Sequence, residues 1–332
     1  MSIGGSLIGS SGGNSGQITS TGDLGAVKIG HDVQGGSGFI SGLINSSGKL
    51  AGVSIGGSLI GGSSQFTGEI RCADLGAVKI GHDLTGGSIT GAALLGSSGV
   101  IQSFFGRISS VTIGGSIVSG IDDSSGALTF NATIRAANDI GSLTVKGSLI
   151  GHGNTGTGAS PVVISARGQA VPGATTDLAI GKISIGGRVE FANILAGYDI
   201  DLNALNGDAQ IGAVKVGGDW AASNLVAGAK NLGADNAAGG SGANADNVNF
   251  GDSHDVSIGP GSLGIIATIA SITIKGQVFG TPNSFSTTDH FGFVAQKIGA
   301  VKIGGNAIVL AAGPHNDNLS VGETTDLSIH EV

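Results

Sequence analysis

The fold of this chain is decided by the stretch Val53-Ser54-Ile55-Gly56-Gly57-Ser58-Leu59. A close variant, Val111-Thr112-Ile113-Gly114-Gly115-Ser116-Ile117, follows later, and related phrases recur about ten times along the chain. Self-similarity at a period near 26 residues is typical of a coil of stacked, similar repeats rather than of a closed globule. The sequence therefore indicates a repeat architecture before it indicates any chemistry.

The first residue of each V-x-I phrase marks one repeat. The markers are Met1, Val27, Val53, Val78, Val111, Leu143, Ile183, Val214, Ile272 and Val301. The first steps between them are 26, 26 and 25 residues, whereas one later step is 58 residues and contains a further candidate copy, Val256-Ser257-Ile258-Gly259. We predict ten to eleven repeats in a single domain over residues 1–332, with short repeats over 1–110 and longer ones over 111–332. The clearest loop insertions are predicted at residues 151–176, 229–255 and 280–296.

Each repeat alternates apolar and polar residues with period 2, which is typical of strands, and is interrupted at Gly-Gly. Val27 and Ile29 are predicted to point inward and Lys28 outward. A further strand at Gly68-Glu69-Ile70-Arg71-Cys72 would complete a three-sided repeat. The Gly-Gly pairs are expected to supply positive φ at the corners. The predicted fold is all-β, a right-handed three-sided parallel β-helix, with the hand taken from the general rule for parallel crossovers.

The composition excludes several classes of protein. The chain has 332 residues, 65 of them Gly, with 40% hydrophobic residues, 11% charged residues and a net charge of -8. A disordered chain would be more charged, and the glycines lack the period of collagen. Without a basic stripe or stacking aromatics we expect no nucleic-acid binding, and without a run of roughly 18 apolar residues no membrane insertion. Cys72 cannot form an internal disulfide, and the first ten residues lack the features of a signal peptide.

Two columns of residues should run along the stack if the alignment is right. The first contains Asp23, Lys49, Asp74, Arg107, Asp139, Ala179, Gln210, Thr268 and Lys297. Its first five members alternate in sign, which would favour one register of the repeats. The second contains Ser2, Lys28, Ser54, Lys79, Thr112, Thr144, Ser184, Lys215, Thr273 and Lys302. No two lysines are adjacent in it, and the interleaved Lys and Ser do not suit the regular Thr array of an ice-binding face.

The candidates for chemistry are few, and we assign no catalytic, cofactor-binding or metal-ligating residue. The pairs His31-Asp32 and His82-Asp83 lie 51 residues apart in a repeated segment. Two repeats separate them, about 10 Å, which is too far to share a metal, so we expect a polar corner role. The pair Asp122-Asp123 would be the acidic pair of a carbohydrate-active enzyme, but no aromatic sugar platform accompanies it.

The stretch 235–255 is the one candidate for calcium. It carries Asp235, Asp246, Asp252 and Asp255 among Asn and Gly, and oxygen ligands of this kind suit Ca²⁺. No calcium-loop motif such as D-x-[DN]-x-[DN]-G is present. A solvated loop is the favoured interpretation, and no cofactor is predicted elsewhere.

The phrases V-x-I-G-G-S-L, at residues 53–59, and L-G-A-V-K-I-G, at residues 24–30 and 75–81, resemble the repeats of large bacterial surface β-solenoids. Haemagglutinin-like and autotransporter-passenger proteins are of this kind. The resemblance implies an extracellular or cell-surface parallel β-helix used for adhesion or scaffolding, and it assigns no functional residue. The chain departs from that pattern because no signal peptide, membrane anchor or cap is visible in it.

The two ends suggest a function. Residues 324–332 repeat the pattern of 175–183, which would put Val332, like Met1, at a marker position. We therefore expect a non-catalytic structural protein that associates with itself head to tail, forming a filament or surface scaffold. Surface polysaccharide or another cell-surface protein stays open as a partner. The alternatives are a segment of a large adhesin-type surface protein and a carbohydrate-active lyase or hydrolase.

Overall fold

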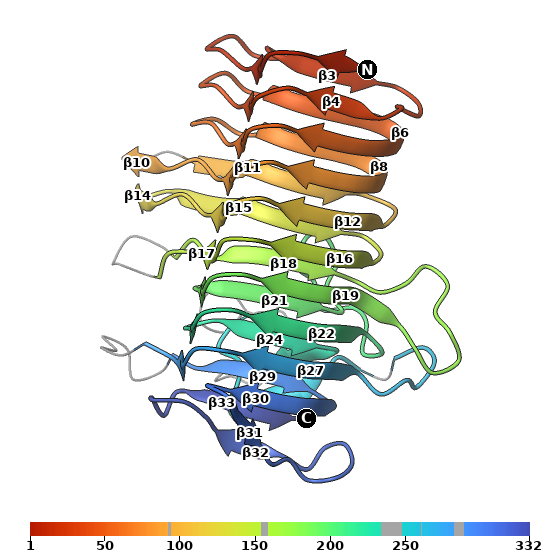
Figure 1. Ribbon diagram of the computed structural model, residues 1–332, viewed down its shortest axis with the longest axis vertical. Coiled ribbons are helices and arrows are strands. Elements are labelled where there is room, and N and C mark those ends of the chain that lie inside the picture. The colour runs from red at the N-terminus through yellow and green to blue at the C-terminus, as the bar shows by residue number, and fades with distance from the viewer. Residues whose placement is uncertain (92–93, 154–158, 234–247, 260, 282–288) are drawn as a thin grey trace. The chain divides into compact units, whose positions relative to one another are not determined.

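The computed structural model describes residues 1–91, 94–153, 159–233, 248–259, 261–281 and 289–332 (Figure 1). Over these residues the chain is all-β, its strands pair mostly in parallel, and no helix is present. The predicted all-β class is confirmed. The chain forms two compact units, Met1–Ala136 with Ser142–Ile164 and Ala137–Gly141 with Ser165–Val332. The single domain over 1–332 stays a prediction, and each unit is described by itself.

In the first unit, three sets of strands pair in parallel. The V-x-I set contains β1 (Ser2–Ile3), β4 (Val27–Ile29), β6 (Ser41–Ile55), β8 (Thr67–Ile80) and β12 (Ile108–Ile113). The second set contains β3 (Gln17–Ser20), the first halves of β6 and β8, β11 (Leu94–Ser103) and β15 (Ala127–Ala136). The third contains β2 (Leu7–Ile8), β5 (Val33–Gln34), β7 (Leu59–Ile60), β9 (Leu84–Thr85), β13 (Ile117–Val118) and β17 (Leu149–Ile150).

The register of the V-x-I strands agrees with the alignment made from the sequence. Val53 pairs with Val27 on one side and with Val78 on the other, and Val78 pairs with Val111. Val27 is buried and Lys28 is exposed, as the alternation predicted. The strand predicted at residues 68–72 exists within β8, where it continues into the V-x-I strand without interruption.

The expectation that the Gly-Gly corners supply positive φ is wrong at most of the described corners, such as Gly56-Gly57 and Gly114-Gly115, and holds at Gly304-Gly305 (φ 56° and 87°). Gly30, Gly56 and Gly81 do not have positive φ; instead they stack closely on one another. A Cβ at Gly56 would collide with the carbonyl oxygen of Gly30, and one at Gly81 with that of Gly56. Glycine is required here because neighbouring repeats approach too closely for a side chain.

Left-handed backbone occurs at another corner, before the first half of the long strands. Ile40 (φ 52°) and Gly42 (φ 65°) adopt it in one repeat, and Phe66 (φ 58°) and Gly68 (φ 61°) in the next. Non-glycine residues rarely adopt this conformation, and bulky ones least of all. This corner could therefore not be located from the residue types alone.

The second unit repeats the same pairing scheme. The V-x-I set contains β19 (Leu178–Ile185), β22 (Gln210–Val216), β27 (Thr268–Ile274) and β30 (Lys297–Ile303). The other sets contain β21 (Ala192–Ala196), β24 (Asn224–Ala227), β29 (Phe291–Ala295) and β33 (Leu327–Glu331), and β20 (Val189–Glu190), β23 (Trp220–Ala221) and β28 (Val278–Phe279). Two further strands, β16 (Ile140–Val145) and β18 (Val162–Ala166), contain residues of both units.

The extra repeat at Val256 is wrong. Val214 pairs directly with Ile272, so the 58-residue step is one repeat with an insertion. Val256 lies in β26 (Asp255–Ser257), which pairs antiparallel with β25 (Ala229–Asn231). The other two predicted loops each contain a repeat strand, since 151–176 includes β18 and 280–296 includes β29.

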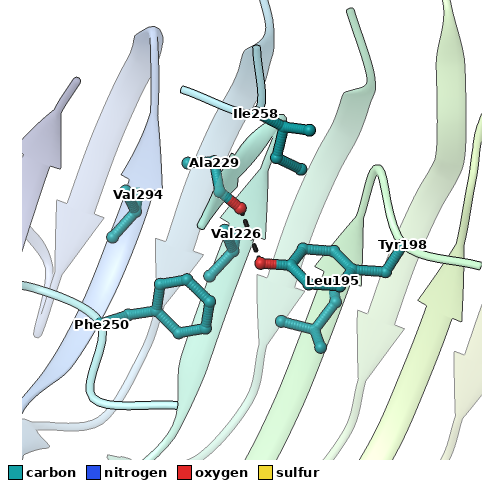
Figure 2. Close-up of a cluster of buried hydrophobic side chains, with 7 residues drawn as sticks. All are labelled: Leu195, Tyr198, Val226, Ala229, Phe250, Ile258 and Val294. Atoms are coloured by element: carbon teal, nitrogen blue, oxygen red, sulfur yellow. Dashed lines mark hydrogen bonds between the residues drawn. The ribbon is translucent and has the colours of Figure 1, made fainter. Parts of the chain in front are cut away.

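The insertion between β24 and β27, together with the segment that follows β21, builds a second core on the second unit (Figure 2). Leu195, Val226 and Val294 pair across β21, β24 and β29, on the face opposite to Phe293. Tyr198, Phe250 and Ile258 cover them and are themselves buried. This outer face is therefore packed rather than exposed to solvent.

Two antiparallel pairings occur after β30, and the repeat pattern did not predict them. β31 (Asn306–Ile308) pairs with β30, and β32 (Asn318–Ser320) pairs with β33. The predicted equivalence of residues 324–332 and 175–183 is wrong, because Leu327 pairs with Phe291 whereas Leu178 pairs with Gln210 in the V-x-I set. Val332 therefore does not occupy a marker position.

Candidate functional site

A column of Ser and Asp side chains follows the corner after each V-x-I strand of the first unit. Asp32 Oδ1 accepts the backbone N–H of Ser58 at 2.7 Å, and Asp83 Oδ1 accepts that of Ser116 at 2.7 Å. Between them, Ser58 Oγ accepts the N–H of Asp83 at 3.2 Å. Hydrogen bonds to a carboxylate are stronger than neutral ones. The aspartates of both His-Asp pairs therefore join neighbouring repeats at the corner.

The same geometry explains why the His-Asp pair returns after two repeats. A Cβ at Gly57 would collide with Asp32 Oδ1, and a Cβ at Gly115 with Asp83 Oδ1. A repeat with Asp at the corner must therefore be followed by one with Gly beside that carboxylate. His31 is exposed at the surface.

The column of alternating charge is present, but its carboxylates act mainly on the backbone. Lys49 Nζ lies 3.8 Å from Asp74 Oδ2 at the surface, where such a pair contributes about 0–1 kcal/mol. Asp23 Oδ1 accepts the N–H of Lys49 at 2.8 Å, and Asp74 Oδ1 accepts that of Arg107 at 3.1 Å. The predicted neighbours are confirmed, and the stronger contact is the one to the peptide group.

One position in this column is corrected. Gln210 pairs with Leu178 rather than with Ala179, because the register shifts between Leu178 and Ile180. The irregularity moves the alignment by one residue at the start of β19. In the second column, Lys215 pairs with both Ser184 and Thr273, as predicted.

The two carboxylates of Asp122-Asp123 do not act together. Asp122 is 5% exposed, and its Oδ1 accepts the N–H and Oγ–H of Ser124 at 3.1 and 2.6 Å. Its Oδ2 accepts the N–H of Leu128 at 3.2 Å. Asp123 is exposed, and as the next residue of β14 (Asp122–Ser124) it points to the opposite side. Asp122 therefore holds the turn that precedes β15.

In the candidate calcium loop, the described carboxylates are bonded to protein donors. Asn231 Nδ2 donates to Asp252 Oδ1 at 2.7 Å and to Asp255 Oδ1 at 2.8 Å. His254 Nδ1 lies 3.0 Å from Asp252 Oδ2, and His330 Nδ1 lies 2.9 Å from Asp255 Oδ2. Asp235 and Asp246 lie outside the described residues.

The two carboxyl groups differ in their acidity. Burial raises the pKa of Asp255, while the hydrogen bonds from His330 and Asn231 act in the opposite direction. Burial also acts to raise the pKa of Asp252, but the bonds from His254 and Asn231 outweigh it, so that pKa is below its usual value. Through these bonds Asp252 and Asp255 hold their segment of the insertion against β25, and Asp255 also joins it to β33.

The single tyrosine, tryptophan and cysteine belong to the interior. Tyr198 Oη donates to the carbonyl of Ala229 at 2.8 Å within the second core (Figure 2). The Trp220 ring packs edge to face on Phe293, with 5.2 Å between the ring centroids. Cys72 is buried, and burial raises the pKa of its thiol to about 12.

Sequence reasoning missed a buried carboxyl group on β8. Glu69 lies on the face of β8 opposite to Ile70, yet it is only 2% exposed. Its neighbours across the strands are Leu43 on β6 and Val100 on β11, and both are buried. Burial raises the pKa of Glu69 to about 8, against the opposing charges of Arg71 and Arg135.

A row of long polar side chains flanks Glu69. Arg71 Nη1 lies 3.7 Å from Glu69 Oε2, an oxygen that accepts no hydrogen bond. Arg71 Nε donates to Asn45 Oδ1 at 3.2 Å, and Arg135 Nη2 donates to Gln102 Oε1 at 3.1 Å. An alternating strand pattern predicts that such residues face solvent. Packing on this outer face instead buries Gln102 and Arg135 and leaves Asn45 and Arg71 half-buried.

The described residues contain no group of three or more His, Cys, Asp or Glu side chains placed to hold a metal ion. No helix long and apolar enough to cross a membrane occurs in the part of the chain that the structure describes. Comparison with protein-family models, with curated proteins and with solved structures finds no match to this chain. A function must therefore be argued from the contacts of the chain itself.

Proposed function

We propose that this chain is a structural, non-catalytic, extracellular or cell-surface protein that associates with itself head to tail. We further propose that its repeats form a right-handed, three-sided β-solenoid of about ten repeats. The observation that carries the proposal is the use made of the polar residues. Asp23, Asp32, Asp74 and Asp83, from four different repeats, each accept a backbone N–H from the following repeat.

Such bonds support a scaffold rather than an active site. A catalytic carboxylate must reach a substrate proton or carbon, whereas these oxygens are occupied by fixed peptide donors at 2.7–3.1 Å. Because each bond joins two repeats, they contribute to the interface term that stabilises repeat proteins. The repeated pairing of the V-x-I residues supports self-association, because β1 and β30, the first and last described strands of this set, are equivalent elements of the repeat.

Electron microscopy and sedimentation velocity at micromolar concentration test the proposal. We expect rods or filaments whose length grows with concentration. A strictly monodisperse monomer over that range would contradict self-association. Depolymerisation of an acidic polysaccharide that is lost on Asp123→Asn would contradict the non-catalytic assignment.

A further inference from the structure

The last V-x-I strand of the described chain carries a covering strand. β30 pairs with β27 along one edge, and β31 occupies the other edge. In the earlier repeats of the first unit that second edge takes the V-x-I strand of the next repeat in parallel, as β4 takes β6. β31 is antiparallel instead, with Lys302 opposite Ala307 and Ile303 opposite Asn306.

The segment that follows β31 covers the other two edges of the same repeat. β32 pairs antiparallel with β33 on the side away from β29. Glu323 N–H donates to the carbonyl of Val278, in β28, at 2.9 Å. An exposed strand edge is a template for pairing with another chain, and covering it is how proteins suppress that pairing. Residues 304–326 therefore end the parallel ladders of the second unit.

The parts of this cover are held unequally. Near β32, the Glu331 carboxylate accepts the N–H of Ile298 at 2.6 Å and that of Asn316 at 3.2 Å. Within the described part of the chain, no side-chain bond of this kind fastens β31, whose Asn306 and Ala307 are exposed and whose Ile308 is half-buried. Its pairing with β30 follows a two-glycine turn. β31 is therefore the element of the cover that is easiest to displace.

The strand that fits the edge of β30 is β1 of a second copy. β1 pairs with β4 through Ser2 and Lys28, and this is the only strand that it pairs with in the described chain. In the outward column, Thr273 pairs with Lys302, so adding β1 would continue the order as Thr273, Lys302, Ser2 and Lys28. No two lysines would become neighbours, and the like-charge repulsion between paired strands would be avoided.

We propose that the outer edge of β30 is a docking surface for β1 of a second copy, and that β31 covers this surface until it is displaced. The inference rests on the proposed head-to-tail association. It adds the strand edge at which the second copy binds and the element, β31, that limits this binding. Main-chain hydrogen bonds would supply the attraction, as in other cases of strand addition. The choice of β1 as the docking strand follows from the outward column, in which Ser2 would lie between Lys302 and Lys28.

A disulfide across β30 and β31 tests the cover without loosening the fold. Lys302→Cys with Ala307→Cys places two thiols opposite each other, in a Cys72→Ala background so that no other cysteine is present. We expect the oxidised protein to stay monomeric in sedimentation velocity, and the reduced protein to associate like the Cys72→Ala parent. Oxidised protein that associates as readily as reduced protein would overturn the inference.

Gly305→Val is the complementary change, because it loosens the turn before β31. Gly305 has φ +87°, and no atom lies within 4 Å of the position that a Cβ would take, so the added residue is strained by its backbone alone. Gly264→Val is the matched control, with φ +66° and equally open surroundings. We expect Gly305→Val to associate at a concentration roughly tenfold lower than the wild type, the effect of about one backbone hydrogen bond, and Gly264→Val to associate at the wild-type concentration. Circular dichroism checks that both variants fold.

The partner strand is tested by adding Ser2→Pro to Gly305→Val, since proline is tolerated on an edge strand but cannot donate. We expect the double variant to return to monomer, and association unchanged by Ser2→Pro would overturn the inference. Association of the oxidised disulfide variant would agree with the proposed self-association but would contradict the covering role of β31. Absence of association in every variant, Gly305→Val included, would contradict both.

Discussion

The buried carboxyl group of Glu69 should make the protein less stable as the pH rises, and Glu69→Gln should remove this dependence. The folded state raises the pKa of Glu69 from 4.5 to about 8. Between these values the unfolded chain releases a proton that the folded chain retains. The free energy of unfolding therefore falls by about 1.4 kcal/mol for each pH unit in this window. The full loss between pH 4 and pH 8 is about 5 kcal/mol, and it is absent below the unfolded pKa.

Glutamine keeps the shape of the side chain and carries no charge. The oxygen that it replaces, Glu69 Oε2, accepts no hydrogen bond, so the exchange removes no such contact. The assay is urea unfolding followed by far-ultraviolet circular dichroism at several values between pH 5 and pH 9. We expect the Glu69→Gln protein to exceed the wild type in stability by an amount that grows toward pH 8. Glu190→Gln is the control, since Glu190 lies near the surface with its Oε2 2.7 Å from Arg188 Nε.

The competing interpretation is that Arg71, 3.7 Å away, keeps Glu69 ionised in the folded protein. In that case Glu69→Gln would leave the guanidinium without its partner and would destabilise the protein. A stability difference that favours the wild type at pH 8, or one that does not change between pH 5 and pH 8, would refute the assignment of a protonated Glu69.

Three further outcomes are expected. Gly56→Ala should lower stability by about 1–3 kcal/mol through its collision with Gly30 of the preceding repeat, whereas Gly25→Ala, with no atom near its Cβ, should be neutral or slightly stabilising; calorimetric melting temperatures decide between them. Asp83→Ala should cost about 1–3 kcal/mol because the N–H of Ser116 loses its acceptor, and Asp83→Asn should cost less; equal losses in chemical denaturation would contradict the capping role. Cys72 should resist a thiol reagent at pH 8 in the folded protein, because burial raises its pKa to about 12, and should react fully in denaturant; rapid reaction of the folded protein would contradict its burial.

The alternation and the repeat were readable from the sequence because both are local. Val27, Lys28 and Ile29 take the predicted sides because successive residues of a strand point to opposite faces. The pairing of Val53 with Val78 was predictable because a slip by one residue would turn the apolar side chains outward. The prediction of an extra repeat at Val256 was wrong because a short motif match carries no information about the strand with which it pairs.

Less of the candidate site could be predicted from the sequence. The corner role of Asp32 and Asp83 could be anticipated from their recurrence, but the reason for it could not. That reason is the space that Gly57 and Gly115 leave for each carboxylate, and it exists only once the repeats are stacked. The chemistry of Glu69 was hidden for a related reason, since its burial depends on Leu43 and residues of other strands.

By itself, the sequence determined the all-β class, the sides of the strands and the register of the V-x-I phrases, because period and apolar pattern act between neighbouring residues. The tertiary structure alone decided which outer strand faces are also buried, as beneath Tyr198 and Phe250, and which strand edges are covered, as β31 covers β30. These depend on the path of segments without a repeating pattern. The conformation of these segments is stabilised by contacts between residues far apart in the chain, and a local sequence pattern contains no information about such contacts.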